Sequence, residues 1–275
     1  MSKTMVIIGP TASGKSEFSI SKAKKLNASI ISADAVQVYK EFNIGSGKLS
    51  KQEMQGIPHH LIDHVSPMET YTVQQFINDA TTLINRKDTP KIICGGSAMY
   101  LRALLYGYQP LKRLPESERP EGTIDELWQQ LNIIDPELAK KTPKQNKQRV
   151  QRYLELNEIY KQPPSSLFKA TPFDKEKYQV FGLSIEKQTL KERINVRVDT
   201  MIRNGLVDEV KYLMEKYDIT QPAFKAIGYK EPIAFLDGKI NKEKMINLIK
   251  TNSHNYAKRQ MTWFRKFDNV QWIEK

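Results

Sequence analysis

Short apolar runs alternate with longer amphipathic segments along the first part of the chain. The runs at 5–8, 29–32 and 91–94 have the length and the apolar content of buried strands. Residues 17–26 are compatible with a helix, and residues 73–84 carry apolar side chains at the spacing of one helical face. Strands that alternate with helices are typical of a parallel sheet, so this pattern predicts an α/β fold.

The end of the chain continues the same pattern. The predicted elements are a strand at 180–185, a helical region at 189–217, a loop or helix start at 224–230, a long helix at 241–266 and a final strand at 270–273. The helical region breaks near Asn204-Gly205, where glycine disfavours a continuous helix. In the last helix we expect Trp263 and Phe264 to pack against the core.

Between these two parts the character of the sequence changes. A charged stretch is broken by Pro110, Pro115 and Pro120, which indicates an exit from the core. Apolar residues between 127 and 134 support a short helix. We therefore expect a small helical insert at 108–167 and a catalytic core formed by 1–107 and 168–275.

A phosphate-binding loop is the strongest motif of the chain. Its residues are Gly9, Pro10, Thr11, Ala12, Ser13, Gly14, Lys15 and Ser16. They follow a predicted strand, precede a predicted helix and match G-x-x-x-x-G-K-[ST] at every fixed position. The glycines let backbone N–H groups point at phosphate oxygens, Lys15 adds a charge, and the Ser16 hydroxyl can ligate magnesium. The motif predicts a P-loop NTPase-like sheet, but it does not say which phosphate compound binds.

Other polar residues follow the ends of the predicted strands. Asp34 comes just after the run at 29–32, while Gly95, Gly96 and Ser97 come just after the run at 91–94. The carboxyl ends of parallel strands meet at one edge of a sheet, where ligands bind. We therefore expect these residues beside the phosphate loop, with the loop-like segment 43–48 close to a ligand.

The charge of the chain suggests an acidic partner. The 275 residues carry a formal net charge of +12, and hydrophobic residues make up 39% of them, enough for a core. Basic residues gather without any acid between 140 and 154, at Lys140, Lys141, Lys144, Lys147, Arg149 and Arg152. Interleaved Asn and Gln side chains suit phosphate and base contacts, so nucleic acid is the leading partner. A generic basic surface is the alternative.

Several classes of protein are disfavoured by composition. The single cysteine, Cys94, excludes an internal disulfide and a cysteine-rich zinc site, and it is interpreted as a core residue. His59 and His60 are neighbours whose side chains diverge in most backbones, so we interpret them as structural. No run reaches membrane-spanning length, and the run at 5–8 is too short for a signal peptide. We expect a cytoplasmic protein without membrane contact, and a monomer.

Taken together, these motifs resemble those of a known family, the tRNA dimethylallyltransferases, also called tRNA isopentenyltransferases. The resembling segments are Gly9–Ser16, Asp34–Tyr39, Gly56–Asp63, Gly95–Tyr100, Arg149–Glu155, Arg193–Asp199, Ala226–Glu231 and Tyr256–Arg265. The last two of these segments, in this order, are highly specific. No cysteine-rich zinc finger follows the core in this sequence, so the resemblance is to the bacterial form of the family.

The resemblance implies a reaction. The family transfers a dimethylallyl group from dimethylallyl pyrophosphate to the exocyclic amine of the adenine 3′ of the tRNA anticodon. By resemblance, the phosphate loop holds the isoprenoid pyrophosphate with Mg2+ on Ser16, Asp34 is the catalytic base, and Arg197, with Arg193 less firmly matched, neutralises the leaving group. Ser97 keeps the hydroxyl of an adenine-contacting threonine. The implied tRNA-binding residues are Asp34, Ala35, Val36, Gln37, Ser97, Gln148, Arg149, Val150, Gln151, Arg152, Lys225, Ala226, Ile227, Gly228, Tyr229 and Lys230.

The chain departs from the family pattern at several positions. The usual serine after the catalytic aspartate is Ala35, and the usual Gly-Thr-Ala-Lys-Pro is the segment 45–49, which reads Gly-Ser-Gly-Lys-Leu. The usual Gly-Gly-Thr-Gly-Leu-Tyr is the segment 95–100, and the usual Thr-Arg before the final motif is Ser253-His254. None of these changes removes a charged catalytic position.

Three other functions fit part of the same sequence. In a small-molecule kinase with this loop, Asp34 would be a magnesium ligand, and ATP hydrolysis or transfer would reveal it. An isopentenyltransferase that acts on free adenine nucleotides would not need the basic insert. An RNA-binding module without catalysis would not need a complete phosphate loop.

Overall fold

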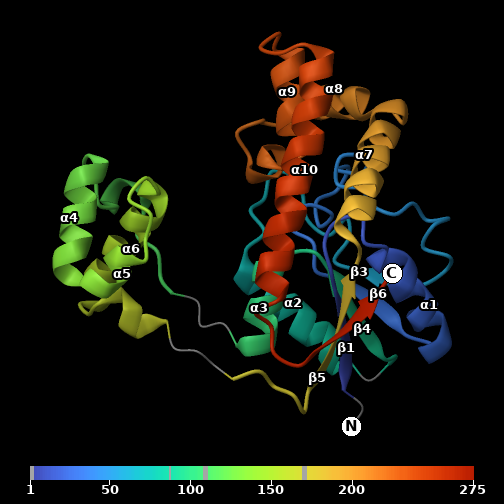
Figure 1. Ribbon diagram of the computed structural model, residues 1–275, viewed down its shortest axis with the longest axis horizontal. Coiled ribbons are helices and arrows are strands. Elements are labelled where there is room, and N and C mark those ends of the chain that lie inside the picture. The colour runs from blue at the N-terminus through green and yellow to red at the C-terminus, as the bar shows by residue number, and fades with distance from the viewer. Residues whose placement is uncertain (1–2, 87, 108–110, 169–171) are drawn as a thin grey trace. The chain divides into compact units, whose positions relative to one another are not determined.

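The computed structural model describes residues 3–86, 88–107, 111–168 and 172–275, and its chain divides into two compact units (Figure 1). Unit 1 comprises Met1–Tyr106 and Phe173–Lys275, and unit 2 comprises Gly107–Pro172. Unit 2 contains the segment for which the prolines and the charge pattern predict an insert. The predicted first residue of that insert, at 108, and Pro110 lie outside the described residues.

Unit 1 is built on a parallel sheet, which confirms the predicted fold class. Within the described residues the sheet has six strands in the order β3-β2-β4-β1-β5-β6. The strands are β1 (Thr4–Ile8), β2 (Ser29–Ser32), β3 (His59–His60), β4 (Lys91–Gly95), β5 (Tyr178–Ser184) and β6 (Val270–Glu274). β1, β2 and β4 are neighbours, so the residues that follow these strands meet at one edge. The sequence pattern missed β3, which is too short to show a periodicity.

Alternation of apolar side chains along the strands separates two hydrophobic layers. Ile7, Ile30 and Ile92 face α1 (Lys15–Leu26) and pack with its Ile20. Their neighbours in sequence point to the opposite face and pack against the other helices of unit 1. These helices are α2 (Val73–Asn85), α3 (Ala98–Tyr106), α7 (Lys187–Arg203), α8 (Leu206–Lys216), η3 (Pro222–Lys225), α9 (Lys230–Leu236) and α10 (Lys242–Phe264).

The helices α7 and α10 lie side by side, with α8 and α9 near one end of the pair (Figure 1). Lys250 of α10 forms an ion pair with Asp199 of α7 at 2.7 Å, and His254 is 2.9 Å from Asn195. Because β5 leads into α7 after only two residues, α7 begins at the carboxyl edge of the sheet. The pair of helices therefore stands beside the edge where the strand ends gather.

The end of α10 corrects one sequence prediction. Phe264 is fully buried, as expected, but Trp263 is 44% exposed. Successive residues of a helix point about 100° apart, so two adjacent aromatic residues cannot both face the core. Within the described residues, no helix combines the length and the apolar character that a membrane span requires.

Unit 2 is a small helical unit with its own core. Its helices are η1 (Glu116–Glu118), α4 (Ile124–Ile134), α5 (Pro136–Lys140), α6 (Lys147–Tyr160) and η2 (Pro164–Leu167). The core joins Leu127 and Leu131 of α4 with Val150 and Leu154 of α6. At the start of α4, Thr123 and Glu126 form a capping box, in which each side chain accepts from the backbone N–H of the other residue.

Candidate active site

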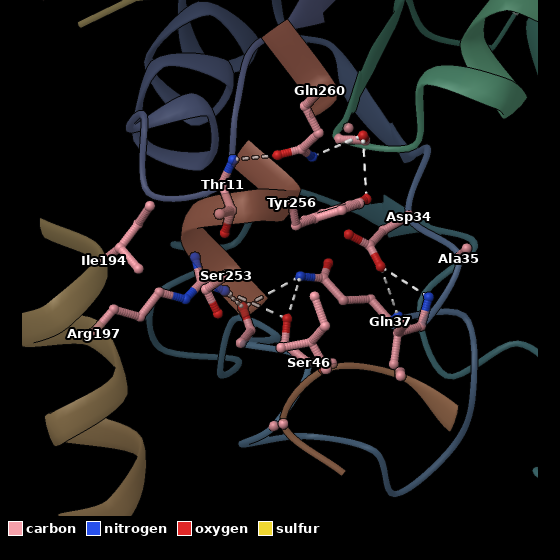
Figure 2. A pocket seen from close by; sticks show the side chains of 18 of the residues that line it. Thr11, Asp34, Ala35, Gln37, Ser46, Ile194, Arg197, Ser253, Tyr256 and Gln260 are labelled. Carbon is pink, nitrogen blue, oxygen red and sulfur yellow. Dashed lines mark hydrogen bonds between the residues drawn. The ribbon is translucent and has the colours of Figure 1, made fainter. Parts of the chain in front are cut away.

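A cavity of about 440 Å³ lies at the carboxyl edge of the sheet, and unit 1 supplies all of its lining residues (Figure 2). The lining comes from the phosphate loop, the segment after β2, the segment 45–47, the end of β4, α7, the segment 225–230 and α10. Its volume is in the range of small-molecule sites. Distant parts of the sequence therefore converge on one ligand-sized space, as the strand-end argument predicts.

The phosphate loop presents Thr11, Lys15 and Ser16 to this cavity. Gly14 precedes α1 with a φ of 81°, a left-handed conformation that glycine adopts without strain. The Lys15 ammonium donates a hydrogen bond to the Pro10 carbonyl at 2.6 Å. Burial lowers the pKa of Lys15 to about 8, although the Asp34 carboxylate opposes this shift. The remaining residues of the loop, Gly9, Pro10, Ala12, Ser13 and Gly14, shape the backbone and do not line the cavity.

Asp34 is half-buried and lines the cavity. Its Oδ1 accepts hydrogen bonds from the backbone N–H groups of Val36 at 2.9 Å and Gln37 at 3.1 Å. These two bonds hold the carboxylate in one orientation. In the described part of the chain, Oδ2 takes part in no protein hydrogen bond, so it is available to a ligand. Figure 2 shows the carboxylate on the same side of the cavity as Tyr256.

Arg197 approaches the cavity from α7, on the side opposite Asp34 (Figure 2). Its Nη2 donates to the carbonyl oxygens of Ser46 at 3.4 Å and Gly47 at 3.5 Å, both long hydrogen bonds. A Cβ at position 47 would collide with the guanidinium, so the glycine at this position makes room for Arg197. Burial lowers the pKa of Arg197, and Asp34 opposes that shift. Arg193, one turn earlier on α7, is exposed and does not line the cavity.

The segment 43–47 that receives Arg197 is held by Glu209 of α8. The Glu209 carboxylate accepts hydrogen bonds from the backbone N–H groups of Asn43, Ile44 and Gly45 at 3.2, 2.7 and 3.1 Å. It also accepts one from the Tyr229 hydroxyl at 3.0 Å. The sequence analysis missed Glu209, because its three backbone partners lie more than 160 residues away along the chain.

The sequence analysis also did not predict Gln260 and Tyr256 of α10 as site residues. Gln260 is 3% exposed and bonds both to the backbone N–H of Thr11 and to the carbonyl oxygen of Gly96, each at 2.8 Å. The Tyr256 hydroxyl donates to the same carbonyl at 3.4 Å, and burial raises the pKa of this tyrosine. Ser97 does not line the cavity, but its N–H donates to the Ala33 carbonyl at 3.1 Å, which places it beside the start of the Asp34 segment.

The structure places one predicted tRNA-binding residue of unit 1, Tyr229, away from the cavity. Tyr229 is fully buried, and its hydroxyl accepts from the Ser46 N–H at 3.0 Å, so it supports the segment 43–47 and does not face the cavity. Cys94 packs against the buried cluster that contains Ile7 and Ile92, as predicted, and it also lines the cavity; burial raises the pKa of its thiol. Ala35, Val36 and Gln37 line the cavity with Lys225, Ala226, Ile227, Gly228 and Lys230.

The predicted segment 148–152 lies in unit 2 on α6, where its side chains have different surroundings. Gln148 and Arg149 are exposed, whereas Val150 is fully buried in the core of unit 2. Gln151 donates to the Pro120 carbonyl at 3.1 Å. Arg152 donates to the carbonyl oxygens of Leu111 and Lys112 at 2.9 and 2.8 Å and pairs with Glu155 at 2.8 Å. Val150 therefore cannot contact RNA through its side chain, and Arg152 is engaged within its own unit.

The donor atoms of the cavity are compatible with Mg2+. Among the described residues, no group of three His, Cys, Asp or Glu side chains could hold a metal ion by itself. Mg2+ does not need such a group, because it keeps several waters and is bound through phosphate oxygens and few protein oxygens. The Ser16 hydroxyl, which lines the cavity in the first turn of α1, is an oxygen donor of this kind.

The fold and the site together define an α/β protein of the phosphate-loop class. Residues 37–267 match the family described as IPP transferase. The chain belongs to this family, the tRNA dimethylallyltransferases, as the resemblance of its motifs predicts.

Relatives match over nearly the whole chain. The tRNA dimethylallyltransferase of Anoxybacillus flavithermus is 40% identical over 286 residues, which cover 99% of this chain and 90% of that protein. The crystal structure of the tRNA isopentenylpyrophosphate transferase from Bacillus halodurans is 36% identical, with a TM-score of 0.74, and the match covers 100% of this chain and 90% of that one. A eukaryotic dimethylallyltransferase acting on tRNA is 30% identical with a TM-score of 0.85, covering 100% of this chain and 74% of that one.

Proposed function

We propose that this protein transfers a dimethylallyl group from dimethylallyl pyrophosphate to the exocyclic amine of the adenine 3′ of the tRNA anticodon, releasing pyrophosphate. The observation that carries the proposal is the convergence of Lys15, Arg197 and Asp34 on one cavity. Two cations suit a departing pyrophosphate, and a carboxylate suits an amine that gains positive charge. The names of the relatives, which share nearly the whole chain, support this substrate pair.

The phosphate loop and Arg197 stabilise the leaving group. The bond between the allylic carbon and the pyrophosphate oxygen breaks, and its electron pair stays on the pyrophosphate. The backbone N–H groups before α1, the Lys15 ammonium and the Arg197 guanidinium stabilise this growing negative charge. Lys15 donates to the Pro10 carbonyl, and Arg197 donates through long hydrogen bonds to the carbonyls of Ser46 and Gly47. In this proposal both cations exchange these contacts for pyrophosphate oxygens.

Asp34 acts on the acceptor amine as the base that removes its proton. An adenine amine is a weak nucleophile because its lone pair is delocalised into the ring, and it becomes acidic only as the new nitrogen–carbon bond forms. The free Oδ2 of Asp34 then takes the proton, while the bonds from Val36 and Gln37 hold the other oxygen in place. Gly96, which lines the cavity, and Ser97, which follows it, belong to the loop that meets the adenine in this proposal. The Ser16 hydroxyl would hold Mg2+, and the ion would supply further charge neutralisation on the leaving group.

The tRNA contacts in this proposal combine the cavity rim with the basic surface of unit 2. The adenine leaves the stacked anticodon loop and enters the cavity, past the segment 225–230 and its exposed Lys225 and Lys230. Exposed cations at the start of α6, among them Lys147 and Arg149, bind the phosphate backbone. In this proposal the enzyme acts as a monomer in the cytoplasm, where it meets tRNA.

The test is a reconstituted reaction. The protein is incubated with Mg2+, labelled dimethylallyl pyrophosphate and unmodified tRNA, and the tRNA is digested to nucleosides for mass spectrometry. We expect label on one adenosine per tRNA and one pyrophosphate released per label. A tRNA with guanosine 3′ of the anticodon is the matched control and should stay unlabelled. Absence of transfer would reject the proposed reaction. Stoichiometric consumption of ATP in a parallel incubation with ATP would instead favour the small-molecule kinase.

A further inference from the structure

Gln260 joins two loops that lie on different sides of the cavity. Its Oε1 accepts a hydrogen bond from the Thr11 N–H, and its Nε2 donates one to the Gly96 carbonyl, both at 2.8 Å (Figure 2). Thr11 belongs to the phosphate loop, and Gly96 directly precedes Ser97. One side chain therefore connects the loop proposed to hold the pyrophosphate with the loop proposed to meet the adenine.

The contact is specific for a glutamine side chain. A backbone N–H only donates and a carbonyl oxygen only accepts, so an exchange of the two amide atoms of Gln260 would lose both hydrogen bonds. At 3% exposure, water has almost no access to replace them. A Cβ on residue 96 would collide with Nε2, so the amide can lie against the backbone only because residue 96 is glycine.

The helix that carries Gln260 is fixed to the other cation of the site. His254 and Lys250 of α10 contact Asn195 and Asp199 of α7, and Arg197 lies between those two positions on α7. Tyr256 adds a second, longer contact from α10 to the Gly96 carbonyl. Through α10, the position of Arg197 is therefore linked to both loops that Gln260 joins.

We infer that Gln260 is a positioning residue for the transfer, acting through Thr11 and Gly96. It sets the separation between the phosphate loop and the loop of Gly96 and Ser97. Through the same two hydrogen bonds, a ligand bound at one loop also restricts the motion of the other loop. The inference rests on the proposed function, because it assigns the two loops to the two substrates. A reaction that needs atoms about 3 to 3.5 Å apart loses about a hundredfold in rate when one partner shifts by about 1 Å.

The first test is Gln260→Met, which keeps the length of the side chain and removes both hydrogen bonds. We expect kcat to fall by about a hundredfold, with the KM of each substrate within about threefold of the wild-type value. The control is Thr262→Val, which removes an exposed 3.0 Å hydrogen bond within the same helix and touches neither loop. Its kcat should stay within about threefold of wild type. A kcat within about threefold of wild type in folded Gln260→Met would overturn the inference.

A second variant guards against loss of folding. In Gln260→Glu, an ionised carboxylate still accepts from Thr11 but repels the Gly96 carbonyl, whereas the protonated carboxyl donates to it and restores both bonds. Burial against a carbonyl oxygen raises the pKa of such a carboxyl. We expect the activity of the variant relative to wild type to rise at least about tenfold as pH falls from about 8 to about 5.5. A ratio that stays constant over this range contradicts the positioning role.

A third measurement is independent of turnover and therefore of the proposed function. Hydrogen exchange of the segment 95–100 is followed by mass spectrometry with and without inorganic pyrophosphate and Mg2+. We expect pyrophosphate to slow exchange of this segment in the wild type and not in Gln260→Met, because the bridge is broken. Protection without any transfer to tRNA would leave the coupling standing and reject only the proposed reaction. Equal protection in both proteins, or none in the wild type, overturns the coupling.

Discussion

The ammonium of Lys15 donates a hydrogen bond to the carbonyl oxygen of Pro10 at 2.6 Å, so the lysine of the phosphate loop folds back on its own loop. Burial lowers its pKa to about 8. In the free protein the charge is therefore lost as pH rises through about 8, whereas the unfolded chain keeps it to about 10.5. Between these values the unfolded chain binds more protons, so this group makes the free energy of unfolding rise with pH.

The first prediction is a pH dependence of ligand binding. Affinity for dimethylallyl pyrophosphate at constant free Mg2+ should fall above pH 8, by up to about tenfold per pH unit, because only charged Lys15 pairs with the pyrophosphate. Calorimetry from about pH 7 to about pH 9.5 measures it. Lys15→Arg is the matched control and should bind more weakly with a flat profile, since arginine stays charged. If the affinity of the wild type does not change with pH over this range, the charge of Lys15 does not bind the pyrophosphate.

Replacement of Asp34 by asparagine should remove the proton acceptor without disturbing the site. The Asn side-chain oxygen still accepts from Val36 and Gln37, so folding and tRNA binding should stay within about twofold of wild type. The single-turnover rate of transfer should fall by about a hundred- to ten-thousandfold. If the rate stays within about threefold, Asp34 is not the base.

Tyr229→Phe should loosen the segment that receives Arg197. The change removes the hydroxyl that joins Glu209 to the Ser46 N–H, and both partners lose a partly buried hydrogen bond. We expect a loss of about 1–3 kcal/mol in the free energy of unfolding and a several-fold lower kcat. Urea denaturation and steady-state kinetics measure the two effects. Tyr212→Phe, the same change at a residue that is 51% exposed, should leave both unchanged within error; equal effects in the two variants would refute a specific support role.

Two neighbouring arginines of α6 should behave differently. Arg149 is exposed, and its replacement by alanine together with Lys147 should reduce the log–log salt slope of tRNA binding by up to about 0.9 for each contact. Arg152→Ala should instead lower the melting temperature of unit 2. The change removes the ion-pair partner of the buried Glu155 carboxylate and the donor to two carbonyl oxygens. Filter binding at several KCl concentrations and thermal unfolding separate the two. If Arg152→Ala reduces the salt slope of tRNA binding and leaves the melting temperature unchanged, Arg152 binds RNA and does not support unit 2.

The local pattern of the sequence was sufficient for the fold and for the centre of the site. Apolar runs between amphipathic segments predicted the parallel sheet, and five of its six strands were confirmed among the described residues. Because the ends of β1, β2 and β4 meet at one edge, the phosphate loop and Asp34 could be brought together from sequence order alone. Arg197 followed from the motif of the family, and it lines the same cavity.

Which side of a helix or loop each residue faces was decided only by the tertiary structure. Val150 and Arg149 are adjacent in one basic stretch, but packing against α4 buries the first and leaves the second in solvent. Tyr229 turns inward, where Glu209 and Ser46 give its hydroxyl hydrogen-bond partners. Gln260 and Thr11 are 249 residues apart, and no local periodicity encodes such a contact. The sequence by itself determined the elements and the groups at their ends, whereas long-range hydrogen bonds decided which polar residues support the site and which line it.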